Sequence, residues 1–161
     1  MISTRLLAAL LAASLARPGL AQDAQPIMRG GFAYSGDGVA PPTDDDSLYR
    51  ALGGRDKIAV FTRDFVRRIA KDDLIGYFFK ETDLDRLAKK LTDQFIDLSG
   101  GPVQYRGARM APAHRDMKIG EADFNRLAEN LQAAMDQADI PFTTQNRLIA
   151  LLAPMKREIV K

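Results

Sequence analysis

Residues 100–114 read GGPVQYRGARMAPAH and are the most informative part of this sequence. This stretch ends on His114, the only histidine among the 161 residues, and the chain contains no cysteine. One imidazole cannot supply the several protein ligands that a zinc site needs. It can serve as the single proximal ligand of a haem, because the porphyrin provides the other nitrogens. The stretch therefore indicates a haem pocket, provided that the remaining sequence can enclose a flat, apolar disc.

Upstream of this stretch, apolar residues recur at the spacing of α-helices. A short helix is expected over Ser47–Leu52, followed by a second helix whose apolar face comprises Ile58, Phe61, Phe65 and Ile69. A short segment over Asp72–Phe79 leads to a third helix, at whose start Thr82-Asp83-Leu84-Asp85 has the pattern of an N-cap with an acidic first turn. The apolar face of this third helix comprises Leu84, Leu87, Leu91, Phe95 and Leu98, and Gly100-Gly101-Pro102 would end it.

Downstream, Pro102–Lys118 is predicted to be mostly loop, with one or two helical turns around His114. Pro141 separates two further apolar stripes, which comprise Phe124, Leu127, Leu131, Met135 and Ala138, and then Leu148, Leu151, Leu152, Met155 and Ile159. No segment alternates strictly between apolar and polar residues, so no strand is predicted. The sequence thus predicts an all-α domain of about six helices over Ser47–Lys161.

Residues 1–21 have the pattern of a secretory signal peptide, with Arg5 before an apolar run and Gly19-Leu20-Ala21 at the cleavage site. The alternative is an uncleaved membrane anchor, although the run Leu6–Ala16 is shorter than the ~20 residues that a span needs. We expect a periplasmic or secreted protein with no stable membrane insertion after cleavage. Residues 22–46, rich in Gly, Pro and Asp, are expected to form a flexible linker.

The charge balance argues against nucleic acid as a partner. Cleavage after Ala21 would remove Arg5 and Arg17, leaving 21 basic residues against 21 acidic ones. The sequence also has no clustered basic face with interleaved aromatic residues. No serine or cysteine hydrolase arrangement can be built, because there is no cysteine and the one histidine is better explained as a candidate metal ligand.

Taken in order, these segments closely resemble the group 1 truncated haemoglobins. The resemblance runs without obvious gaps from Ser47 to Val160 and rests on the run SLYRALGG at residues 47–54, Phe78-Phe79, Gly100-Gly101-Pro102, Tyr105, Met110, His114, Ile119, Asp123-Phe124 and Leu151–Pro154. It implies a two-over-two helical sandwich around haem b. It also implies a very short first helix and a loop in place of most of the proximal helix.

The resemblance further implies roles for single residues. His114 matches the proximal iron ligand of the family, and Phe79 matches the residue that stacks on the haem. Other positions that would contact the cofactor are Leu87, Lys90, Leu91, Phe95, Tyr105, Met110, Ile119, Phe124, Leu127 and Leu152. Each apolar member of this set could equally be an ordinary core residue. The sequence lacks Cys-x-x-Cys-His, so covalent thioether attachment of the haem is not expected.

The expected distal pocket departs from the family pattern. Group 1 members commonly carry a tyrosine where this chain has Val66 and a glutamine where it has Leu91, whereas Leu87 is apolar as it often is in the family. Losing such donors costs on the order of 1.5–3 kcal/mol each. We therefore expect weak or fast-releasing oxygen binding and rapid oxidation to the ferric form. Gln94 is the remaining polar group on this face, and a surface position is the more common alternative for it.

Lys90 flanks the same helix face, about 60° from Leu87 at about 100° per residue. In some truncated haemoglobins the matching residue is a sixth iron ligand, and lysine is one of the types that does so. A lysine must lose its proton before it can bind iron, which burial favours. The alternatives are a salt bridge to a haem propionate or a solvated lysine beside Lys89.

Three functions remain open at this point. The first is a haem protein that binds O2, NO or CO, with nitric oxide dioxygenase or peroxidase-like activity. It would need a separate, unknown redox partner, because nothing in the sequence resembles a flavin or nicotinamide site. The second is a non-catalytic electron-transfer or ligand-switching protein that uses Lys90. The third is a globin-like module without haem, against which the presence of His114 and Phe79 argues.

Overall fold

The structure is a computed structural model that describes residues 45–161. The predicted signal peptide, residues 1–21, and residues 22–44 of the expected linker lie outside the described residues. Residues 45–161 form helices and no strand, so the predicted all-α class is confirmed. No helix in this part of the chain is both long enough and apolar enough to cross a membrane.

The described residues contain seven α-helices and two 3₁₀ turns. The α-helices are α1 (Ser47–Ala51), α2 (Gly54–Lys71), α3 (Leu84–Leu98), α4 (Met110–His114), α5 (Glu121–Gln137), α6 (Phe142–Leu152) and α7 (Lys156–Ile159), and the 3₁₀ turns are η1 (Gly76–Phe79) and η2 (Ala153–Met155). The expected number of about six helices was one too low. Pro154, in η2, has no N–H to donate to an α-helix, and the last predicted stripe divides there into α6, η2 and α7.

The boundaries of α3 lie where the sequence signals predicted them. Asp83 caps the helix, since its carboxylate accepts a hydrogen bond from the Arg86 N–H at 3.0 Å. Gly100 follows the helix with a φ of +84°, and a Cβ at this position would collide with the backbone carbonyl of Asp45. The carboxylate of Asp45 accepts hydrogen bonds from the N–H and the hydroxyl of Ser47, at 2.8 and 2.7 Å. The folded domain therefore already includes this end of the expected linker.

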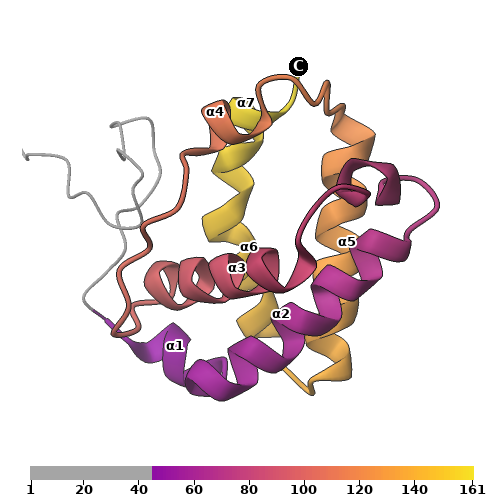
Figure 1. Cartoon of the computed structure of the whole chain (residues 1–161). Coiled ribbons are helices and arrows are strands. Elements are labelled where there is room, and N and C mark those ends of the chain that lie inside the picture. Colours follow the sequence, from indigo (N-terminus) through magenta and orange to yellow (C-terminus); the bar gives the residue numbers. More distant parts are fainter. Residues whose placement is uncertain (1–44) are drawn as a thin grey trace, which may run out of the picture.

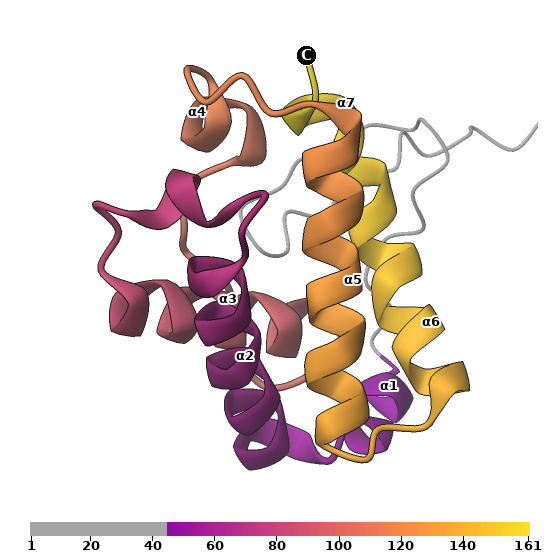
Figure 2. The ribbon, with the colours of Figure 1, turned by 90° about the vertical axis from the view of Figure 1, so that its right-hand side faces the viewer.

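Two pairs of helices, α2 with α3 and α5 with α6, form the body of the domain (Figures 1 and 2). α2 packs against α3 and α5, and α5 packs against α6. Phe61 of α2 and Phe95 of α3 stack in the first pair, with ring centroids 6.0 Å apart. The short α4 and α7 contact each other at the end of the molecule that carries the C-terminus, the upper end in Figure 1. This arrangement is the predicted two-over-two sandwich.

The core divides into two clusters. The larger one lies between α2, α3, α5 and α6. The smaller one lies under α4 and α7 and comprises Leu98, Tyr105, Met110, Ile119, Met155 and Ile159. Phe78, Leu151 and Leu152 are half-buried and pack against both clusters. These shared residues mark the place where the two apolar regions meet.

Candidate functional site

A cavity of about 550 Å³ lies between η1, α3, α4, α5 and α6. This volume falls in the range of small-molecule and cofactor sites, roughly 300–1,000 Å³. Most of its walls are apolar side chains, and its polar residues are Thr82, Arg86, Lys90, Gln94, Tyr105 and His114. A largely apolar ligand with a few charged groups fits this lining.

His114 is the last residue of α4 and is half-buried in the cavity wall. Its Nδ1 donates a hydrogen bond of 2.8 Å to the Met110 carbonyl, because a carbonyl oxygen can only accept. The proton is thereby held on Nδ1, and the lone pair is left on Nε2. A neutral imidazole with its other nitrogen bonded to a carbonyl is the usual arrangement of a metal-bound histidine. His114 can therefore hold a metal through Nε2.

The structure brings most of the expected cofactor residues to the same cavity. Besides His114, its walls include Phe79, Leu87, Lys90, Leu91, Phe95, Tyr105, Met110, Phe124, Leu127 and Leu152. They come from five different elements and the loop before α4.

Two expected pocket residues do not line the cavity. Val66 is buried in the larger core cluster, and the neighbouring Phe65 reaches the cavity instead. Adjacent residues of a helix point about 100° apart, so α2 directs these two side chains into different parts of the interior. Ile119 packs in the smaller cluster, beyond the cavity wall, and its carbonyl accepts a hydrogen bond from the Lys161 N–H.

Several lining residues were missed by the sequence analysis. They include Phe65, Phe78, Arg86, Met117, Leu131, Ile149 and Met155. Phe65, Leu131 and Met155 belong to apolar stripes that the sequence does show. A stripe identifies the buried face of a helix, but not whether that face contacts another helix or a cavity. Gln94 is 3% exposed and lines the cavity, so the surface alternative for it is wrong.

The charged edge of the cavity lies on the first half of α3. Arg86 and Lys90 are one helical turn apart, and both are exposed side chains that line the cavity. Neither forms an ion pair with any other residue in the range 45–161. Two cations beside an apolar chamber, and one imidazole that can bind a metal, fit haem, because the porphyrin is apolar and carries two propionates.

The loop before α4 is fixed by Tyr105. Its backbone N–H donates to the Asp97 carboxylate at 3.1 Å. Its ring covers Gly107, where any Cβ would collide with the phenol hydroxyl. Burial raises the pKa of the Tyr105 hydroxyl. These contacts hold the segment that leads to His114 against the end of α3.

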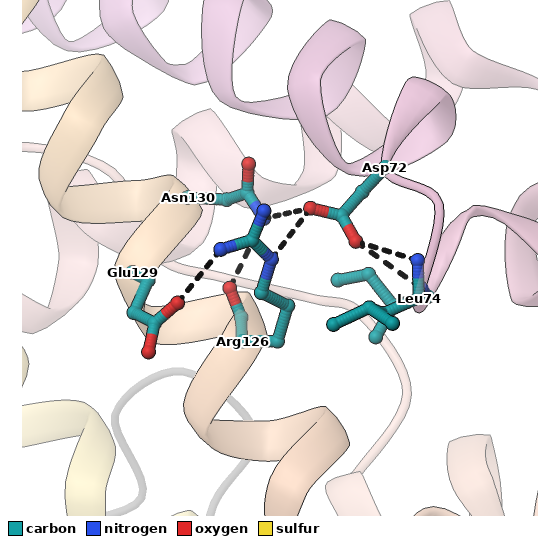
Figure 3. A network of polar contacts seen from close by, with 6 residues as sticks. Asp72, Leu74, Arg126, Glu129 and Asn130 are labelled. Atoms are coloured by element: carbon teal, nitrogen blue, oxygen red, sulfur yellow. Dashed lines mark hydrogen bonds and ion pairs between the residues drawn. The ribbon is translucent and has the colours of Figure 1, made fainter.

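A polar network outside the cavity joins the end of α2 to α5 (Figure 3). One carboxylate oxygen of Asp72 accepts from the N–H groups of Leu74 and Ile75, at 3.0 and 3.3 Å. The other accepts from Arg126 Nε at 2.8 Å and Asn130 Nδ2 at 2.9 Å. The hydrogen bond from Asn130 contributes most to lowering the Asp72 pKa to about 2. The network thus fixes η1 relative to α5, and both elements are walls of the cavity.

Comparisons with known proteins identify the family. Residues 47–161 match the model of the family described as bacterial-like globin. The group 1 truncated haemoglobin GlbN of Mycolicibacterium paratuberculosis is 31% identical over 113 residues, which cover 70% of this chain and 83% of that protein. A group 1 truncated haemoglobin of Tetrahymena pyriformis is 27% identical over 114 residues, which cover 71% of this chain and 94% of that protein. The crystal structure of truncated haemoglobin from Tetrahymena pyriformis in the Fe(III) form matches with a TM-score of 0.68 and 27% identity, covering 70% of this chain and 97% of that one. The chain therefore belongs to the bacterial-like globin family, as a group 1 truncated haemoglobin.

Proposed function

We propose that this truncated haemoglobin binds diatomic gases, O2, NO or CO, at the iron of a haem b that His114 holds. The observation that carries the proposal is the imidazole in the cavity wall, with Nδ1 bonded to the Met110 carbonyl and Nε2 left for a metal. When bound, haem would supply an iron that His114 would hold and that can bind a diatomic gas. The chain supplies the chamber and the orientation of the imidazole.

The cavity walls are complementary to both the apolar porphyrin ring and the charged propionates of the haem. Phe79 and Leu127 offer apolar surface to the porphyrin. Arg86 and Lys90 offer positive charge to the propionates at the edge of the cavity. The loop fixed by Tyr105 sets the position of α4, and with it the position of His114.

The α3 face that meets the gas is mainly apolar. Leu87 and Leu91 both line the cavity, and their side chains have no hydrogen-bond donor. We therefore propose that oxygen is released fast and that the iron oxidises readily, which argues against oxygen storage. More specifically, we propose that the protein detoxifies nitric oxide or peroxide. This function requires a separate redox partner that returns electrons to the iron.

An absorption titration tests this function. The mature chain is loaded with haem, reduced, and exposed in turn to CO, NO and O2. The proposal predicts a distinct Soret shift with each gas, and with O2 a complex that soon decays to the ferric spectrum. Haem-loaded protein whose spectrum does not respond to any of the three gases would contradict it.

A second candidate function follows from the position of Lys90. This lysine lies on the cavity wall, one turn from Leu87, and forms no ion pair within residues 45–161. As a sixth iron ligand it would favour electron transfer or ligand switching over gas binding. A six-coordinate, low-spin resting spectrum that Lys90→Ala makes high-spin would support this function. A resting spectrum unchanged in Lys90→Ala would exclude it.

Export is proposed on the sequence of residues 1–21 alone, which lie outside the described residues. Cell fractionation with N-terminal sequencing tests it. A periplasmic or secreted product that begins at Gln22 is expected, and an intact N-terminus in the cytosolic fraction would contradict it.

A further inference from the structure

Gln94 interrupts the apolar cavity face of α3. It follows Leu87 by seven residues and Leu91 by three, so about 100° per residue places all three within about 60° on one face. All three line the cavity. Gln94 lies three residues beyond Leu91, about 4.5 Å along the helix axis. A side chain that can donate a hydrogen bond is therefore present on this face.

This amide is buried with hardly any protein partner. Gln94 is 3% exposed. Its only hydrogen bond within residues 45–161 runs from Nε2 to the Met155 sulfur at 3.8 Å. A thioether is a weak acceptor, so this contact leaves most of the hydrogen-bonding capacity of the amide unused.

A second buried glutamine, Gln145, has the strong hydrogen bonds expected of a residue with a structural role. Gln145 is 1% exposed, and its Nε2 donates to the Asp136 carboxylate at 2.6 Å and to the Ile140 carbonyl at 2.9 Å. Gln145 is not among the residues that line the cavity. Gln145 thus connects α6 to the end of α5, whereas Gln94 makes only a weak contact with the Met155 sulfur. Burying a polar group without a good partner destabilises a fold, so packing alone does not explain Gln94.

We propose that the side-chain amide of Gln94 donates a hydrogen bond to the diatomic ligand in the cavity and so determines which gas is retained. A donor at this place favours ligands whose outer atom carries negative charge, as bound oxygen does, over carbon monoxide, which accepts hydrogen bonds weakly. The inference rests on the proposed function, because it requires haem and gas in the same cavity. It assigns the ligand a hydrogen bond from Gln94, so oxygen release that is already fast beside the apolar Leu87 and Leu91 would be faster still without this residue.

Carbon monoxide is the probe that tests this inference. The C–O stretching frequency of the reduced, haem-loaded chain is measured by infrared spectroscopy, because a donor beside the ligand lowers it. Wild type is compared with Gln94→Leu, with Gln94→Met, which keeps the side-chain length, and with Gln145→Leu as the matched buried control. Oxygen dissociation rates and thermal midpoints are measured on the same proteins.

We expect both Gln94 variants to raise the C–O frequency and to speed oxygen dissociation roughly threefold to tenfold. They should keep the thermal midpoint of wild type. Gln145→Leu should lower the midpoint and leave both ligand measurements unchanged. Unchanged frequencies and rates in the Gln94 variants would overturn the inference alone, whereas a wild type that binds neither haem nor CO would overturn the proposed function with it. Failure of both Gln94 variants to fold would also count against the inference, since it would make Gln94 a packing residue.

Discussion

Replacing Asp72 by asparagine should destabilise the domain in a pH-dependent way. The carboxylate is 3% exposed and accepts four hydrogen bonds, two of them from α5. A pKa of about 2 in place of 3.8 corresponds to about 2 kcal/mol of stability at neutral pH. Arg126 is 42% exposed, so water screens its share of the interaction. We therefore expect Asp72→Asn to lower the free energy of unfolding by about 1–2 kcal/mol at pH 7.

The sign of the pH dependence follows from the depressed pKa. The contribution of Asp72 is complete above the unfolded-state pKa near 4 and disappears as the pH falls through about 2, where the protonated carboxyl resembles asparagine. The midpoint of thermal unfolding should fall by roughly 4–8 °C at pH 7 and by much less near pH 2.5. Both proteins are measured at one haem concentration, because a bound ligand adds to stability by mass action.

The neighbouring carboxylate provides the control for this prediction. Asp73 is exposed and forms no hydrogen bond or ion pair through its side chain within residues 45–161. Asp73→Asn should therefore leave the midpoint nearly unchanged at every pH. The reasoning would be refuted if Asp72→Asn were no more destabilising than Asp73→Asn, or if its effect were the same at pH 7 and pH 2.5.

Two further predictions concern the cavity walls. Phe79→Ala should weaken haem affinity by roughly tenfold, because an aromatic contact contributes about 0.5–1.5 kcal/mol beyond its buried area. Haem transfer to apomyoglobin measures this, and Phe142→Ala, which removes an aromatic ring that is 66% exposed, should have no effect. Leu91→Gln adds a donor to the cavity face of α3 and should slow oxygen dissociation roughly threefold to tenfold in stopped-flow measurements. An unchanged or faster rate would show that this face does not meet the ligand.

Local signals in the sequence were enough to predict most of the helices of this fold. Asp83 caps α3, and Gly100 with Gly101 ends it, because both effects depend on neighbouring backbone groups. The split of the last stripe at Pro154 could also have been predicted, since a proline has no N–H to give.

The candidate site was predictable only in part, because it depends on contacts between distant segments. Val66 and Phe65 both lie on buried faces of α2, and periodicity does not show which face meets the cavity. Asp72 was predictable as a local cap of the turn after α2. Its bonds to Arg126 and Asn130 span 54 and 58 residues, and no sequence spacing indicates them. Gln94 is likewise buried and contacts Met155, 61 residues away, which no sequence spacing indicates.

Chemical rescue of a His114→Gly variant tests the role of this histidine. Its proposed role is to serve, through Nε2, as the proximal ligand of a haem in the cavity. His114→Gly should lose the spectrum of the wild-type ferrous CO complex, and added imidazole, free to occupy the vacated space, should restore it in a concentration-dependent way. A wild-type spectrum in His114→Gly without imidazole would contradict this role, because the iron would then be held by another residue.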